Sequence, residues 1–205
     1  MKISDLSIEL SNYIVDNYEE KILRKIINTD YGHFMPYEQE EIYKISLKNR
    51  PEYNDLIARE MHEYLKDNDT IILDGFVNFR LKDYRIALTE TIEKAVSEFE
   101  VKREYETFIG LLRYFVDMQQ PRHNTINLIG CRDGKVKVLD EKRTEICSRI
   151  DDADVLLDLT LTNAPRKIAI HRIENFKNEE VLNTIMKVFA GKTTICKKCR
   201  LCATI

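Results

Sequence analysis

Apolar side chains along the first 70 residues recur at the spacing of helices. In the first segment one follows every fourth residue from Leu6 to Ile26. A glycine and a proline in "DYGHFMPYEQ" end this segment. Pro51 ends a second helix, because the residue before a proline disfavours helical geometry. A third pattern then repeats over residues 56–65, so three helices are expected before residue 70.

The stretch "DNDTIILDGFVNFRLKDY" allows two interpretations. Val77, Phe79 and Leu81 alternate as in a strand, whereas Asp74 can cap a helix. We expect a helix from about residue 75. A long helical pattern then continues to Pro121, and its apolar positions are Leu88, Ile92, Ala95, Phe99, Tyr105, Ile109, Leu112 and Val116.

The period of the apolar positions changes after Pro121. "TINLIGCRDGKVKVLD" alternates apolar and polar residues on both sides of a turn at "RDGK", which predicts a β-hairpin. "SRIDDADVLLDLTLTNAP" has a helical pattern ended by Asn163 and Pro165. We assign Cys147, next to this pattern, to the apolar face of that helix.

The last forty residues follow the order strand, helix, strand. "RKIAIH" and "KTTIC" are strand candidates, and "NEEVLNTIMKVFAG" between them is a helix. Short connections of this kind place the two strands parallel and adjacent, with a right-handed crossover. The expected fold is therefore α+β, with a helical lobe at 1–120 and a small α/β lobe at 121–205 that contains the hairpin and the C-terminal βαβ unit.

Three thiols at a spacing of three residues follow the final strand in "TTICKKCRLCATI". If the two strands of the βαβ unit are parallel neighbours, His171 and Cys196 lie at the same edge of the sheet, where open α/β sheets bind ligands. Cys131 also ends a strand. Cys196, Cys199 and Cys202 together with either His171 or Cys131 would supply the four ligands of a tetrahedral zinc site.

Three other interpretations of the thiols remain open. C-x-x-C-x-x-C begins the ferredoxin motif for an iron–sulfur cluster, but the fourth cysteine followed by proline is missing. A thioredoxin-like redox pair is disfavoured, because too few residues follow Cys199 to build the helix that this motif opens. The thiols are also compatible with no cofactor at all. Zinc is the cofactor that we expect.

Composition and charge narrow the class of protein. The chain has 205 residues, 43% of them hydrophobic, and a net charge of −3, which suits a globular protein. Residues 1–120 carry 16 Lys and Arg against 24 Asp and Glu, whereas residues 121–205 carry 16 against 11. Because the C-terminal residues are basic, a nucleic acid remains an alternative partner. The chain has neither a phosphate-binding loop nor a dinucleotide fingerprint, and this absence argues against two large enzyme classes.

The sequence also predicts a compartment. The N-terminal residues lack the apolar core of a secretory signal, and no stretch approaches the roughly 20 consecutive apolar residues of a membrane span. We therefore expect a cytoplasmic protein with no membrane partner. In that compartment, five cysteines are thiols or metal ligands and not a disulfide framework.

Three segments resemble the YtxC family of sporulation proteins of endospore-forming bacteria. They are "DGFVNFRLKDY" at 74–84, "LLRYFVDMQ" at 111–119 and "VFAGKTTICKKCRLC" at 188–202. The resemblance implies a sporulation setting and no particular chemistry. We expect a non-enzymatic interaction protein with a protein partner and a metal site at its C-terminus. The alternatives are a nucleic-acid-binding regulator that uses the basic tail, and a redox or iron–sulfur enzyme.

Overall fold

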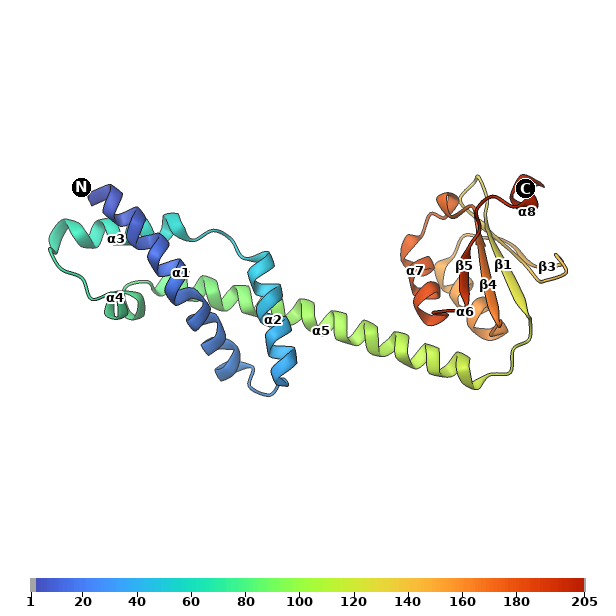
Figure 1. Cartoon of the computed structure of the whole chain (residues 1–205), viewed down its shortest axis with the longest axis horizontal. Helices are drawn as coiled ribbons and strands as arrows, with labels where there is room; N and C mark the ends of the chain where they lie inside the picture. Colours follow the sequence, from blue (N-terminus) through green and yellow to red (C-terminus); the bar gives the residue numbers. More distant parts are fainter. Residues whose placement is uncertain (1–2, 205) are drawn as a thin grey trace. The chain divides into compact units, whose positions relative to one another are not determined.

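The computed structural model describes residues 3–204 and has an α+β fold (Figure 1). The chain divides into two compact units, Met1–Arg103 and Glu104–Ile205. The helix α5, Lys82–Met118, belongs to both of them. The domain boundary expected at residue 120 stays a prediction. Within residues 3–204, no helix combines the length and the apolar character that crossing a membrane requires.

The first unit is built of helices, as its apolar periodicity predicted. They are α1 Ile3–Asp30, α2 Pro36–Asn49, α3 Asn54–Asp67, α4 Leu73–Phe79 and the beginning of α5. The helix α2 ends two residues before Pro51, where the proline was expected to end it. Side chains from all five helices form one core, which includes Ile14, Leu23, Ile42, Ile57, Phe76 and Leu88.

The ambiguous stretch around residue 75 is helical. It forms α4, and a short break at Arg80 and Leu81 separates it from α5. Phe76 and Leu81 are buried, whereas Phe79 is exposed. The alternation of Val77, Phe79 and Leu81 therefore does not reflect a strand.

A buried carboxylate lies inside this helical unit. Glu19 on α1 forms a salt bridge with Arg50 and accepts a hydrogen bond of 3.0 Å from the Tyr84 hydroxyl on α5. Buried charges are stable only when they are paired and hydrogen-bonded. Glu19 therefore links α1 to α5. Its salt bridge and hydrogen bond offset the free-energy cost of burying its charge.

The second unit contains a five-stranded sheet in the order β3-β2-β1-β4-β5. The strands β1, Thr125–Gly130, and β2, Val136–Leu139, form the expected antiparallel hairpin. The strands β4, Lys167–His171, and β5, Thr193–Ile195, pair in parallel, with helix α7, Glu179–Val188, between them in sequence. Figure 1 shows β1, β4 and β5 side by side. The predicted βαβ unit is confirmed.

One strand was missed. Residues Glu145–Ile150 form β3, which pairs antiparallel with β2, and helix α6 begins only at Ala153. The assignment of Cys147 to a helix is wrong, because it lies in β3 opposite Val138. The helix begins late because the Asp152 carboxylate accepts hydrogen bonds from the backbone N–H groups of Asp154 and Val155 and so caps it.

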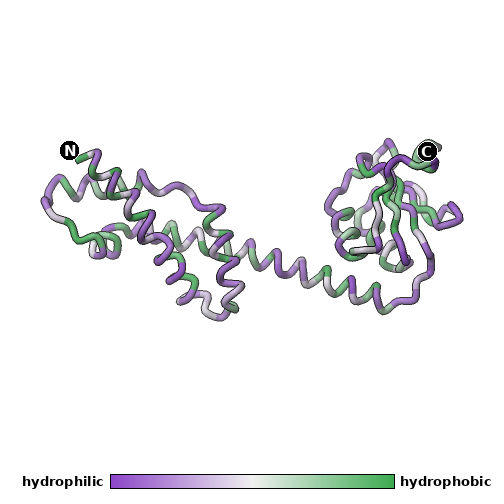
Figure 2. The backbone as a smooth tube through the Cα atoms, viewed as in Figure 1, coloured by the Kyte–Doolittle hydropathy of each residue, from purple (hydrophilic) through white to green (hydrophobic). Residues whose placement is uncertain are grey.

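Helices pack on the sheet to form the core of this unit. Ile109 and Val116 from α5 join buried residues of the strands and of α6 and α7 in one cluster. Figure 2 shows hydrophobic residues along the strands and hydrophilic residues in the connecting loops. At the end of β1, Gly130 lies against the segment after β4, and a Cβ atom there would be 2.6 Å from the Arg172 carbonyl oxygen. This close approach fixes the chain immediately after His171.

Candidate metal centre

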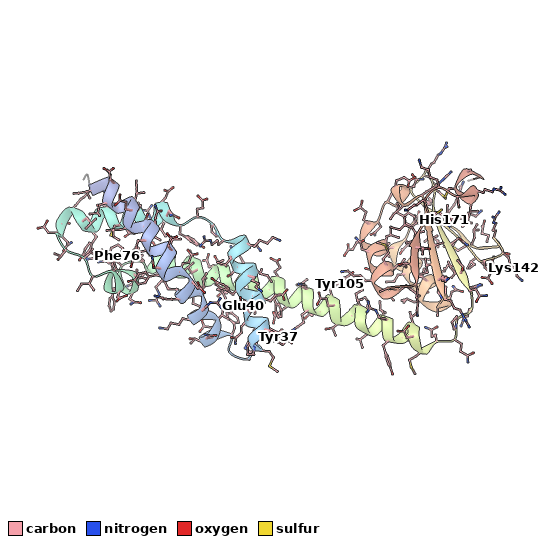
Figure 3. The ribbon with its side chains drawn as sticks, viewed as in Figure 1. Tyr37, Glu40, Phe76, Tyr105, Lys142 and His171 are labelled. Carbon is pink, nitrogen blue, oxygen red and sulfur yellow. The ribbon has the colours of Figure 1, made fainter. Side chains whose placement is uncertain are left out.

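His171 ends β4, where β1 on one side and β5 on the other leave it buried (Figure 3). Its Nε2 atom is 3.1 Å from Oδ1 of Asn127 on β1. The Nδ2 group of Asn127 donates to the carbonyl of Asp140, which turns the amide oxygen toward the histidine. Since that oxygen is an acceptor, Nε2 carries the proton and Nδ1 keeps a free lone pair.

The three thiols come from the chain that follows β5. The Cys196 N–H donates to the Ile170 carbonyl at 2.8 Å, so the parallel ladder continues to this residue. The backbone then reverses through Lys198, which has a φ of 64°. The short helix α8, Arg200–Thr204, carries Cys202 back toward the histidine. The sequence around the thiols therefore forms a compact loop at the edge of the sheet.

Four ligand atoms meet at this edge, and we call His171, Cys196, Cys199 and Cys202 the Cys3His group. The atoms all lie within 4.8 Å of one another. Sγ of Cys202 is 3.8 Å from Sγ of Cys196 and from Sγ of Cys199. Nδ1 of His171 is 3.5 Å from Sγ of Cys199 and 3.4 Å from Sγ of Cys202.

These four separations match four of the six edges of a tetrahedron around zinc, and the other two pairs lie within 4.8 Å. With Zn–S bonds of about 2.3 Å and a Zn–N bond of about 2.0 Å, a regular tetrahedron has S–S edges of about 3.8 Å and S–N edges of about 3.5 Å. A disulfide, by contrast, needs sulfur atoms about 2.05 Å apart. All five cysteines are free thiols. The Cys3His group is therefore able to hold a single metal ion.

The protonation of the group also suits a metal. Burial lowers the pKa of His171, which keeps the imidazole neutral, as a ligand must be. A hydrogen bond from the Cys202 backbone lowers the pKa of Cys199 to about 7. Burial raises the pKa of Cys196 to about 11. At neutral pH a metal would thus meet a partly ionised Cys199 and would displace the proton of Cys196.

Arg172 holds the loop against the sheet. Its backbone has a φ of 53°, and its guanidinium group donates to the Cys202 carbonyl oxygen in α8. Non-glycine residues seldom adopt this conformation, which costs on the order of 1 to 2 kcal/mol. Arg172 and Lys198 are both next to a member of the Cys3His group, so two strained backbone positions flank the four converging ligand atoms.

The remaining cysteines lie outside the Cys3His group. Cys131 begins the turn of the hairpin, where its N–H donates to the Lys135 carbonyl and its Sγ is 3.8 Å from the Ile129 carbonyl oxygen. Cys147 lies in β3. Of the two candidates for the fourth ligand, His171 is therefore the one that the structure brings to the three thiols.

Two residues that shape the site were not predicted from the sequence, and one premise about the chain after Cys199 was wrong. Asn127 was visible as a polar residue in the apolar "TINLIG", but its partner is 44 residues away. Nothing in the sequence around Arg172, except its position after His171, indicated that it would contact Cys202. The premise that too few residues follow Cys199 for a helix is wrong, because α8 begins at Arg200.

A cavity of about 460 Å³ opens beside the Cys3His group. Its lining residues are Arg172, Glu174, Cys196, Lys197, Lys198, Cys199, Cys202 and Ala203. Three of these side chains are cationic and one is anionic. The surroundings of the group are therefore basic, as the sequence of the C-terminal residues indicated.

Fold and site together define an α+β protein whose sheet ends in a three-cysteine, one-histidine group able to hold a metal. Residues 5–194 match the YtxC-like family, and the chain belongs to that family. The match ends at residue 194, before the three thiols of the group.

A curated relative matches part of the chain. The chain is 30% identical over 73 residues to the Uncharacterized protein YtxC of Bacillus subtilis (strain 168). That alignment covers 36% of this chain and 26% of the relative, so the chain spans about a quarter of the curated protein that it matches. No solved structure is similar enough to count as a match.

Proposed function

We propose that the Cys3His group binds one zinc ion that has a structural role. The observation that carries the proposal is the agreement between the S–S and S–N separations and the edges of a zinc tetrahedron. Four protein ligands leave no position for water or substrate, which is the arrangement of structural zinc and not of catalytic zinc. The zinc would tie the loop after β5 to the end of β4.

An iron–sulfur cluster fits the same atoms less well. A cluster contains several iron atoms, and each iron takes at most two protein ligands, so four protein ligand atoms cannot all lie as close together as around a single ion. The thiol pairs at 3.8 Å leave space for one ion only. This argues against the iron–sulfur enzyme as the function of the site.

The biological role that we propose is that of an interaction protein of the sporulation programme, acting in the cytoplasm. Membership of the YtxC-like family supports the setting. The zinc-stabilised sheet would serve as a scaffold, and large apolar side chains that remain exposed on α5 would provide a surface for a protein partner.

Nucleic-acid binding is a second candidate, favoured by the basic cavity beside the Cys3His group. Arg172, Lys197 and Lys198 line it. Such contacts would go to phosphates and would weaken steeply as salt increases. Binding of a fluorescent oligonucleotide at 50 and 200 mM salt tests this candidate, and Lys197→Glu combined with Lys198→Glu should abolish the binding. Binding that does not change with salt would exclude it.

Metal analysis of tag-free protein purified without oxygen tests the zinc proposal. We expect about one zinc per chain by elemental analysis, and two reactive thiols that increase to five after chelation. Cys196→Ser should lose the metal, whereas the matched controls Cys131→Ser and Cys147→Ser should keep it. Metal-free protein with five reactive thiols would overturn the proposal, and iron with visible absorbance would favour the cluster instead.

A further inference from the structure

The helix α5 has large apolar side chains on two faces within the second unit. On one face, Ile109 and Val116 are buried in the core of that unit. Tyr105, labelled in Figure 3, also belongs to this face, and its hydroxyl is 3.0 Å from the Thr184 hydroxyl. The face beside it also carries large apolar side chains, which a helix of a globular protein ordinarily buries. That adjoining face of α5 therefore requires an explanation.

We call Phe108, Leu111, Phe115 and Met118 on that adjoining face the α5 seam. Their exposed fractions are between 48% and 70%. They follow one another at spacings of three, four and three residues, the pattern by which paired helices interlock in a coiled coil. Tyr114, beside them, is also exposed. Contiguous exposed apolar surface of this kind marks a site of protein contact.

We propose that the α5 seam pairs with the α5 seam of a second copy of this chain, with the two helices antiparallel. The spacing of the seam reads the same in both directions, so a two-fold axis between Leu111 and Phe115 aligns all four positions. Phe108 then faces Met118 of the partner subunit, and Leu111 faces Phe115 of the partner subunit. The partner proposed above for the exposed side chains of α5 is thus a second copy of this chain, and the pairing does not depend on the metal.

Charges at the two ends of the seam select the antiparallel orientation. Glu104 lies in α5, four residues before Phe108, and Arg122 lies in the segment after the helix, four residues beyond its last residue Met118. Both are exposed, and neither forms a salt bridge within the part of the chain that the structure describes. An antiparallel pair brings the start of the seam in each copy, with Glu104, to the end of the seam in the other copy, where Arg122 follows the helix. A parallel pair would place like charges together at both ends.

The size of the seam fits a reversible dimer. Large aromatic side chains present about 150 to 250 Å² each, so the four seam residues and Tyr114, with exposed fractions of 48% to 70%, offer on the order of 500 Å² per copy. The pair would bury on the order of 1,000 Å², the lower limit for a specific interface. We therefore expect association in the micromolar range and not an obligate dimer.

Sedimentation velocity of the full chain across a concentration series, with zinc and a phosphine reductant present, tests the proposal. We expect the mass to rise from one copy to two. Leu111→Glu should weaken dimerisation at least tenfold, and Met118→Lys, at the exposed helix end, provides a second variant with less risk to folding. The matched control is Ile86→Glu, an exposed apolar residue of α5 outside the seam, which should leave dimerisation unchanged.

A charge exchange tests the orientation. Glu104→Arg and Arg122→Glu should each weaken the dimer about tenfold, and the double variant should restore it, because the two pairs reform with opposite sign. A monomer at every concentration would overturn the proposal, as would a dimer that Leu111→Glu and Met118→Lys leave intact. A double variant no tighter than the single variants would overturn the antiparallel orientation.

Discussion

Oδ1 of Asn127 lies 3.1 Å from Nε2 of His171 across two neighbouring parallel strands. The contact fixes both the ring orientation and the tautomer that presents Nδ1 to the thiols. Groups that orient a metal-binding histidine in this way typically contribute 10- to 100-fold to metal affinity. Asn127 is therefore a positioning residue of the proposed zinc site.

We predict that Asn127→Ala weakens zinc binding about 10- to 100-fold, because the imidazole loses the partner that holds its proton on Nε2. Competition with a chromophoric chelator measures the affinity. Asn175→Ala is the matched control, since Asn175 donates to the Gly130 carbonyl in the same unit without touching a ligand. Equal effects of the two substitutions would contradict a specific role for Asn127.

Removal of zinc should loosen the end of the sheet and leave the helical unit unchanged. A ligand present at a hundred times its dissociation constant stabilises the folded state by about 2.7 kcal/mol, which is a hundredfold change in local opening. Hydrogen exchange with and without chelator should therefore accelerate up to about a hundredfold at residues 193–204. Amides of α3 should not respond, and a uniform response along the chain would argue against a local site.

Lys198→Gly should tighten zinc binding about fivefold. Glycine adopts a positive φ without the steric cost that Lys198 bears, so about 1 kcal/mol of strain in the loop is relieved. Lys198→Ala removes the same charge but keeps the cost, and it should not tighten binding. Chelator competition compares the two variants, and a gain shared by both would assign the effect to charge.

The stability of the helical unit should fall above pH 10 through Tyr84. Burial raises the pKa of this phenol above its usual value of 10.0. Above pH 10 the unfolded chain loses the proton while the folded chain keeps it, so the free energy of unfolding decreases as pH rises, and the contribution is complete below pH 10. Urea unfolding at pH 8 and pH 10.5 measures the difference.

Tyr84→Phe should remove part of this alkaline loss. It should also cost about 1 to 3 kcal/mol at pH 8, because the buried Glu19 loses a hydrogen-bond donor. Exposed Tyr37 provides the control, and Tyr37→Phe should change neither quantity. An unchanged pH dependence in Tyr84→Phe would show that other groups cause the alkaline loss.

Gly130→Ala should destabilise the second unit by about 1 to 3 kcal/mol. The added methyl group would be 2.6 Å from the Arg172 carbonyl oxygen and 2.9 Å from Cδ2 of Phe176, which forces the chain after His171 to move. Gly75→Ala is the control, because a Cβ there meets nothing within 4 Å. Thermal unfolding of both variants tests the prediction, and equal midpoints would contradict it.

The sequence was most informative where structure depends on local pattern. The hairpin and the βαβ unit were predictable from alternation and from the length of "NEEVLNTIMKVFAG", and the parallel pairing places His171 and Cys196 at one edge. The strand β3 was missed because Glu145–Ile150 runs into the acidic start of α6 without a glycine or proline between them. Periodicity alone does not separate a short strand from the first turn of a helix.

Details of the candidate site depend on contacts between distant residues. The Asn127 contact spans 44 residues, and the Arg172 contact to α8 spans 30. The positive φ of Lys198 and of Arg172 had no signal either, because glycine usually marks such positions and neither residue is a glycine. The metal-binding residues were therefore predictable from their residue types. The contacts that orient them and the backbone angles of the loop were not.

The position of β5 has a consequence for solubility. This strand has only three residues and forms the outer edge of the sheet beside β4, whose Ile168 and Ile170 are fully buried. If β5 detached, β4 would present a bare edge of unpaired backbone groups with apolar side chains, the kind of surface on which other chains add as strands. A metal bound at the end of β5 would keep this strand attached and would thus also reduce aggregation.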